Sequence, residues 1–285
     1  MTREQLFFDV RRRLETAGIS MPELEARELT ACALGVDRQR LLMQRTSPVS
    51  DAERERLEQL VARRLAHEPL AYLLGEWDFC GITLRVTPDV LIPRSDTERL
   101  CELAALRAGQ VSAPRVLDLC SGSGCIALAL LKQVPDAQAV GVDVSPAAVA
   151  LANENAQRMR LSDRYEAIEG DALTAPPADY RQAFDVLVCN PPYITAEEMR
   201  ALDPDVSDYE PHLALYGGTD GLDFYRTILD TWAQVVKPGG ALFFECGWKQ
   251  GEAVASLCRA AGWQDVCVHT DYAGIPRIVT AEKTR

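Results

Sequence analysis

The sequence predicts an α/β fold, in which a mostly parallel sheet ending in an antiparallel hairpin follows a small all-α domain. Residues 1–74 carry only helical patterns, whereas short apolar runs alternate with helical stretches from Pro114 onward. That alternation is typical of a parallel sheet with helices on both faces. The last two runs, 265–270 and 277–280, are separated by too few residues for a crossover helix, so we expect them to pair antiparallel.

The first 74 residues are expected to form a helical bundle. Capping boxes, in which the N-cap residue and the residue three positions later bond each other's backbone, predict where its helices begin. They are Thr2-x-x-Gln5, Ser20-x-x-Glu23 and Ser50-x-x-Glu53. The apolar spacing that follows each box predicts helices that end near Gly18, Gly35 and His67.

The rest of the chain is expected to form a β-hairpin linker over 75–92 and a larger domain over 93–285. Residues 77–90 are β-prone, with Gly81 as the turn candidate. A fourth capping box, Ser95-x-x-Glu98, predicts a helix to about Ala108. Strands before the final hairpin are expected at 115–119, 137–142, 165–168, 184–189 and 241–245.

Charge and composition exclude several classes of function. The chain has 285 residues and a net charge of −12. All of this charge lies on residues 75–285, because within residues 1–74 twelve Arg balance twelve acidic residues. Domains that grip nucleic acid are usually basic, so we expect no direct nucleic-acid partner. The nine cysteines form no C-x-x-C pair, so we expect no metal. No apolar run suits a signal peptide or a membrane span, so we expect a cytoplasmic protein without a membrane partner.

A turn of small residues follows the predicted strand 115–119. It consists of Cys120, Ser121, Gly122, Ser123 and Gly124, and a helical pattern begins directly after it. Glycines let a ligand approach the backbone closely, and the amides at a helix N-terminus favour a polar or anionic group. Asp143 ends the next strand, 19 residues after Gly124, where a carboxylate can accept both ribose hydroxyls of a nucleoside.

The loop favours a methyl-donor cofactor over a dinucleotide. Its G-x-G spacing lacks the third glycine of the dinucleotide fingerprint. Asp118 lies inside the strand end, where an acid suits the amino group and sulfonium of S-adenosyl-L-methionine and repels a pyrophosphate. Asp171, in Gly170-Asp171-Ala172 at the end of the third strand, has two interpretations: its carboxylate reaches an adenine amino group, or it caps a turn.

The run 184–189 leads directly into Asn190-Pro191-Pro192-Tyr193. The two prolines fix the backbone and remove two amide donors, which leaves carbonyl oxygens free to accept. The side-chain oxygen of Asn190 is a further acceptor, and Tyr193 offers a flat face. Two acceptors suit a planar group bearing an NH2, whose nitrogen they would hold and aim at a methyl group. A purely structural Pro-Pro turn is the alternative.

N-P-P-[YFW] after a strand resembles the signature of methyltransferases that act on planar nitrogen, both N6-adenine and glutamine enzymes. Nearly the whole chain resembles the bacterial peptide chain release factor N5-glutamine methyltransferase family. The similar segments include E-P-L-A-Y at 68–72, L-I-P-R-S-D-T-E at 91–98, D-Y-E-P at 208–211 and D-Y-A-G at 271–274. The resemblance implies a class I methyltransferase-like fold, S-adenosyl-L-methionine as cofactor, peptide chain release factors as protein substrates, and residues 1–74 as the substrate-docking domain.

The resemblance also implies the site residues. Cofactor contacts would come from Cys120, Ser121, Gly122, Ser123, Gly124, Asp143, Asp171, Ala172 and Asn190. Substrate contacts would come from Asn190, Pro191, Pro192 and Tyr193, with Leu91 as an apolar wall, and Asn190, Pro191 and Tyr193 would be catalytic. Three positions depart from the family pattern: Cys120 stands where glycine is usual, Ser95 where proline is usual, and Ala172 where a bulkier residue is common. We expect these departures to change affinity and to leave activity intact.

Two other functions are compatible with parts of the sequence. The first is N6-adenine methylation of DNA or RNA. The chemistry of Asn190-Pro191-Pro192-Tyr193, which we call the clamp, would be nearly the same for that reaction. The negative charge of residues 75–285 argues against it. The second is a non-catalytic, partner-binding protein with a degenerate cofactor fold, and the intact Asn190-Pro191-Pro192-Tyr193 sequence argues against that.

Overall fold

The computed structural model describes residues 1–284. The chain folds into two units. The first unit comprises Met1–Glu76 together with Asp203–Tyr209, and the second comprises Trp77–Leu202 and the chain from Glu210 onward. No helix among residues 1–284 is long and apolar enough to cross a membrane.

The first unit is a helical bundle, as predicted. Its helices are α1 (Arg3–Thr16), α2 (Pro22–Leu34), α3 (Arg38–Met43), α4 (Asp51–Leu65) and α5 (Leu70–Leu74). The capping boxes at Thr2 and Ser50 are both present. The predicted box at Ser20 is wrong: Met21 precedes α2 without a side-chain cap, because Pro22, whose ring presets a helical φ, takes the first helical position.

A segment distant in sequence completes the first unit. It contains the short helix α9 (Pro204–Ser207). Asp205 accepts hydrogen bonds from the Arg64 guanidinium and from the His67 ring, each at 2.9 Å. The hydroxyl of Tyr209 donates to the carbonyl of Ala66 at 2.6 Å. Nothing in the sequence pattern indicated that this segment belongs with the N-terminal helices.

The predicted hairpin at 77–90 is present as β1 (Glu76–Phe79) and β2 (Ile82–Arg85). Cys80 and Gly81 form its two-residue turn, with φ of 46° and 75°. Positive φ at both turn residues matches the twist of a two-residue hairpin. The strands form a separate two-stranded sheet.

The second unit is built on a seven-stranded sheet of order β5-β4-β3-β6-β7-β9-β8. The strands are β3 (Arg115–Leu119), β4 (Gln138–Asp143), β5 (Tyr165–Glu169), β6 (Phe184–Cys189), β7 (Val236–Glu245), β8 (Gln264–Thr270) and β9 (Pro276–Glu282). All pairings are parallel except those of β9, which runs antiparallel to both β7 and β8. The predicted fold class is therefore confirmed.

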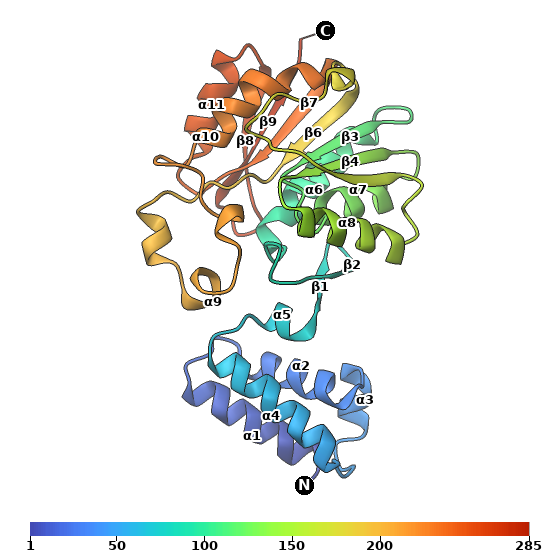
Figure 1. Ribbon diagram of the computed structural model, residues 1–285, viewed down its shortest axis with the longest axis vertical. Coiled ribbons are helices and arrows are strands. Elements are labelled where there is room, and N and C mark those ends of the chain that lie inside the picture. Colours follow the sequence, from blue (N-terminus) through green and yellow to red (C-terminus); the bar gives the residue numbers. More distant parts are fainter. Residues whose placement is uncertain (285) are drawn as a thin grey trace. The chain divides into compact units, whose positions relative to one another are not determined.

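Helices cover both faces of this sheet (Figure 1). The helices α6 (Ser95–Ala108), α7 (Cys125–Gln133) and α8 (Pro146–Arg158) share one apolar core with Val116 of β3. On the other face, α10 (Asp223–Thr227), the π-helical turn Ile228–Trp232 and α11 (Gly251–Ala260) share a second core with Leu117. Consecutive strand residues point to opposite faces, so β3 contributes to both cores. Short 3-10 turns lie at Ala178–Tyr180, Glu198–Ala201, His212–Ala214 and Ala233–Val235.

The helix predicted from Ser95 is present, but its capping box is not. Arg94 is the N-cap of α6 and makes no side-chain capping bond, while Ser95 is already helical. The Glu98 carboxylate instead accepts from the backbone amide of Cys80 at 2.9 Å. Glu98 therefore ties the hairpin to α6.

Candidate active site

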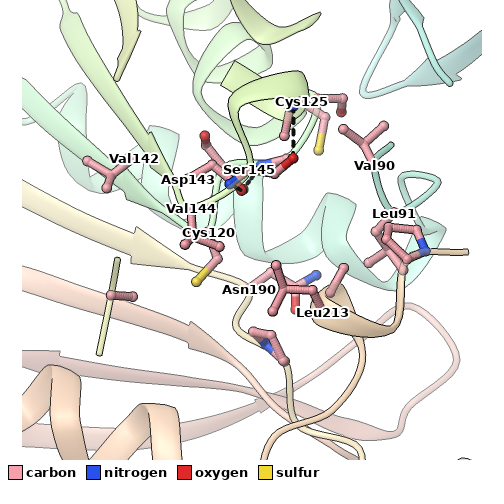
Figure 2. A pocket seen from close by; sticks show the side chains of 18 of the residues that line it. Val90, Leu91, Cys120, Cys125, Val142, Asp143, Val144, Ser145, Asn190 and Leu213 are labelled. Carbon is pink, nitrogen blue, oxygen red and sulfur yellow. Dashed lines mark hydrogen bonds between the residues drawn. The ribbon is translucent and has the colours of Figure 1, made fainter. Parts of the chain in front are cut away.

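A cavity of about 230 Å³ lies at the carboxyl ends of β3, β4, β5 and β6. The sheet order reverses between β3 and β6, and ligands bind at such switch points in open α/β sheets. Figure 2 shows Asp143, Cys120 and Asn190 from neighbouring strand ends, with Leu91 and Leu213 toward the other side. Ten of the residues proposed from the sequence line this cavity: Leu91, Cys120, Ser121, Gly122, Ser123, Asp143, Asp171, Ala172, Asn190 and Pro192.

Three of the proposed residues, Gly124, Pro191 and Tyr193, do not border the cavity. Gly124 is the N-cap of α7, with φ of 78°. A Cβ added there would lie 3.0 Å from the hydroxyl of Tyr165 and 3.3 Å from the Cβ of Ala152. This glycine therefore lets α7 pack closely against the sheet, beneath the loop that faces the ligand.

The loop after β3 is held in its shape by Asp143. Oδ2 of Asp143 accepts from the amide of Gly122 at 2.8 Å, and Oδ1 accepts from the amide of Ser145 at 3.0 Å. Burial raises the pKa of Asp143, and these amide bonds oppose that rise. A carboxylate has about four acceptor sites, so lone pairs remain for a nucleoside ribose. Asp143 thus has a structural role in addition to the one proposed from the sequence.

The part of the cavity at the ends of β4 and β5 is mostly apolar. Asp171 caps a turn, because its Oδ1 accepts from the amide of Leu173 at 2.8 Å. Its side chain also borders the cavity, so an adenine contact stays a prediction. Ala172 is buried in the second core, and Val144 and Leu173 add apolar surface that the sequence reasoning missed. Val144 follows Asp143 directly, so the strand end itself was the signal that could have found it.

The clamp is anchored through the side-chain nitrogen of Asn190. Its Nδ2 donates to Oγ1 of Thr97 at 3.2 Å, and Thr97 is buried in α6. Among the described residues, the amide oxygen of Asn190 and the carbonyl of Pro191 accept no hydrogen bond. Both acceptors that the sequence indicated are therefore free.

The ring of Tyr193 does not reach the cavity, although a flat face for the substrate was expected. Its hydroxyl donates to Oε1 of Glu245 at 3.4 Å, and its ring packs against the second core. Its carbonyl accepts from Nε2 of Gln250 at 3.0 Å. A Cβ at Gly217 would lie 2.6 Å from the Cα of Tyr193, so this part of the clamp is tightly enclosed.

The wall formed by Leu91 is fixed by a buried carboxylate. Glu210, only 4% exposed, accepts from the amide of Ile92 at 3.2 Å and pairs with the guanidinium of Arg94. A buried charge is costly unless it is paired, so Glu210 holds both neighbours of Pro93 in place. Leu213, three residues beyond Glu210, also lines the cavity, and only the tertiary fold places it there.

The cavity fits S-adenosyl-L-methionine. Arg94 is the only cationic side chain among the described residues that line it, and Glu210 neutralises that charge. Three carboxylates, those of Asp89, Asp143 and Asp171, line it as well. A sulfonium would therefore meet no unpaired positive charge, and Asp143 is available for the ribose.

The fold and the cavity define a class I methyltransferase that uses S-adenosyl-L-methionine. Residues 110–273 match the methyltransferase domain family, and residues 5–75 match the PrmC N-terminal domain. The hMettl16 catalytic domain, solved in complex with a MAT2A 3′UTR hairpin, has a TM-score of 0.59 and 16% identity, covering 79% of this chain and 81% of that one. That likeness shows the fold alone.

Similar sequences identify the family more narrowly than the fold does. Release factor glutamine methyltransferase from Geobacter sulfurreducens is 46% identical over 266 residues, which cover 93% of this chain and 91% of the relative. The protein of the same name from Moorella thermoacetica is 41% identical over 282 residues, which cover 99% and 98%. The chain belongs to the release factor glutamine methyltransferase family.

Proposed function

We propose that the chain transfers the methyl group of S-adenosyl-L-methionine to the side-chain amide nitrogen, N5, of a glutamine in peptide chain release factors. Family membership supports the reaction. The observation that carries the mechanism is the state of Asn190, whose Nδ2 is bound to Thr97 while its oxygen is free beside the cavity. A free acceptor there is what an incoming NH2 requires.

The clamp works by orienting a weak nucleophile. The nitrogen lone pair of an amide is delocalised toward its carbonyl. Two hydrogen bonds, to the oxygen of Asn190 and to the carbonyl of Pro191, would hold both hydrogens of the target NH2 and increase electron density on nitrogen. Positioning and fixed dipoles of this kind lower the barrier without a base, because the nitrogen proton becomes acidic only as the methyl group transfers.

Further parts of the proposal concern the partner and the compartment. Residues 1–74 serve as the docking domain for the release factor, and the reaction takes place in the cytoplasm. We expect no direct nucleic-acid partner, since residues 75–285 hold 18 basic against 30 acidic residues. We also expect no membrane partner.

The proposal is tested with purified release factor and labelled donor. Mass spectrometry of a digest should show a gain of one methyl group on one glutamine, and release factor with that glutamine changed to alanine should stay unlabelled. Duplex DNA and a structured RNA serve as competing acceptors in parallel reactions. Label on adenine at a rate matching the protein substrate would favour adenine methylation instead.

A further inference from the structure

The two prolines leave the centre of the clamp without backbone amides that could hold it in place. Pro191 and Pro192 have no amide hydrogen, and each ring also restricts the residue before it, so the segment is stiff. Its amino end is fixed by β6, because Cys189 pairs with both β3 and β7. The direction of the Pro191 carbonyl, one of the two acceptors, therefore depends on what holds the other end at Tyr193.

The side-chain amide of Gln250 holds that other end. Its Nε2 donates to the carbonyl of Tyr193 at 3.0 Å and to the carbonyl of Gly221 at 3.4 Å. Its Oε1 accepts from the backbone amide of Gly247 at 2.9 Å. Both ends of the amide are in use, and together they tie the clamp to the turn after β7 and to the loop before α10.

The helix that Gln250 precedes does not explain this residue. Gln250 is the N-cap of α11, yet its side chain makes no capping bond. Serine, threonine, aspartate and asparagine are the side chains that cap a helix well. A residue that departs from a local preference and makes its hydrogen bonds elsewhere indicates a constraint from outside the helix. Here that constraint is the carbonyl of Tyr193.

Two glycines let the clamp lie this close to its surroundings. A Cβ at Gly221 would lie 2.3 Å from the carbonyl oxygen of Tyr193 and 2.4 Å from Nε2 of Gln250. A Cβ at Gly217 would lie 2.5 Å from the carbonyl oxygen of Pro192. These distances are well inside van der Waals contact, so a larger residue at either position would displace the clamp.

We propose that Gln250 is a positioning residue for the methyl transfer, which fixes the Tyr193 carbonyl and so directs the Pro191 carbonyl at the target nitrogen. The inference rests on the proposed function, because it deepens the mechanism of the same clamp. Gln250 does not border the cavity, so it acts only through the clamp. Thr97 holds the side chain of Asn190 in the same way from α6. Each of the two acceptors is thus oriented from outside the cavity.

Steady-state methylation of a release factor by Gln250→Met and Gln250→Glu tests the inference. Gln250→Met keeps the length and removes the bonds, so kcat should fall roughly tenfold, the equivalent of one hydrogen bond, with KM changed less than about threefold. Gln250→Glu keeps the acceptor for Gly247 but sets a carboxylate oxygen against the carbonyl of Tyr193, so its kcat should fall at least as far. Cofactor affinity, measured by calorimetry, should stay unchanged in both variants.

Gly217→Ala displaces the clamp independently of Gln250. It should lower kcat at least as much as Gln250→Met, because its Cβ meets the backbone of the clamp. Gly109→Ala is its matched control, since a Cβ there has no neighbour nearer than 3.4 Å, and Gly109 does not border the cavity. Gln133→Met is the control for Gln250→Met, because Gln133 donates only to the Ala129 carbonyl within α7. Both controls should keep the kcat of the parent.

The outcomes separate this inference from the proposed function. A parent that is inactive on release factor refutes the proposed function. An active parent with Gln250→Met within twofold of its kcat overturns the positioning role. Gln250→Glu that matches the parent while Gln250→Met is impaired overturns it as well, because the bond to Gly247 alone would then matter. Circular dichroism checks each variant, and if Gln250→Met does not fold, Gln250→Glu and Gly217→Ala decide the question.

Discussion

Cys120 adopts a left-handed backbone, with φ of 57°, at the residue where β3 enters the cofactor loop. An L-residue pays roughly 1–2 kcal/mol for this conformation, which glycine adopts freely. The family resemblance places glycine here, and the structure shows the reason: the turn itself needs positive φ. The Cys120 side chain also borders the cavity (Figure 2). One residue therefore combines backbone strain with a position on the cavity wall.

Cys120→Gly should stabilise the protein by up to about 1 kcal/mol, because relief of the left-handed conformation exceeds the extra entropy that glycine loses on folding. Cys120→Val should destabilise it, because a β-branched side chain tolerates positive φ poorly. Denaturant unfolding measures both effects, and calorimetry measures cofactor affinity, which the glycine variant should keep. A less stable Cys120→Gly protein would show that the thiol contributes more by packing than the turn costs.

Asn190→Ala tests the clamp itself. The substitution removes one of two preorganised acceptors and leaves the prolines in place, so kcat should fall about 10²–10³-fold. The loss should appear mainly in kcat, since the hydrogen bond matters most as charge develops on nitrogen. Asn190 is half-buried at a loop mouth, so the fold should survive. Turnover within about threefold of the parent, in a protein folded by circular dichroism, would make the clamp a structural turn.

At the scale of elements, local chemistry explains what the sequence could predict. The strands 115–119 and 184–189 lie where expected, because short runs rich in apolar residues end there at small residues or at Asn190 and the prolines. Helix starts were predicted where the N-cap side chain does the capping, at Thr2 and Ser50. The capping boxes predicted at Ser20 and Ser95 are absent, although α6 does begin at Ser95. Pro22 takes the first position of α2, and the Glu98 carboxylate accepts from Cys80 instead of from the start of α6.

The same distinction between local pattern and tertiary contact applies to the residues of the candidate site. Its strand-end residues follow from parallel topology, which brings the carboxyl ends of neighbouring strands to one edge. Residues that reach it through tertiary contacts do not follow from pattern: Thr97 from α6, Glu245 behind the clamp, and Leu213 more than twenty residues after Asn190. The position of the Tyr193 ring also could not be predicted from the sequence, because its hydrogen-bond partner, Glu245, lies 52 residues away along the chain.

Asp118 links β3 to α7 and makes the second unit sensitive to pH. Its side chain is fully buried, its Oδ2 accepts from the amide of Ala127 at 3.2 Å, and burial raises its pKa to about 8. The folded state thus keeps a proton that the unfolded chain releases near its ordinary value of 3.8. Stability from this group is full below that value and is lost as pH rises through about 8.

We therefore expect the unfolding free energy to fall between pH 7 and 8. This range suits the test because Glu245, with a pKa of about 7, contributes less there to the change of unfolding free energy with pH. The slope for one proton is at most about 1.4 kcal/mol per pH unit. Asp118→Asn keeps an acceptor for Ala127 and should flatten the dependence. All four tryptophans lie in the second unit, so their fluorescence during denaturation reports on it. Equal slopes in parent and variant would mean that Asp118 is ionised in the folded protein.

At the scale of the whole molecule, the net charge favours a protein substrate over a nucleic-acid substrate. The net charge is −12, and residues 1–74 contribute nothing to it because their twelve arginines and twelve acids cancel. Several of those arginines are also engaged in ion pairs, among them Arg13 with Glu58 and Arg63 with Glu68. Each phosphate that a protein holds normally requires a cation, which releases counterions and makes binding depend steeply on salt. Neither residues 1–74 nor residues 75–285 carry an excess of such cations.

The last prediction follows from that balance. At moderate salt the full-length protein should label release factor with methyl groups and leave adenine in duplex DNA unlabelled, although the clamp could hold either NH2. Raising the salt should change release factor methylation far less than it changes a reaction that depends on phosphate contacts. Fluorescence anisotropy with a labelled duplex should show no binding in the micromolar range. Asn190→Ala, assayed on both acceptors, identifies whether any label on DNA comes from this active site. DNA methylation that matches the protein reaction, and that Asn190→Ala abolishes, would show that the clamp sets specificity without help from surface charge.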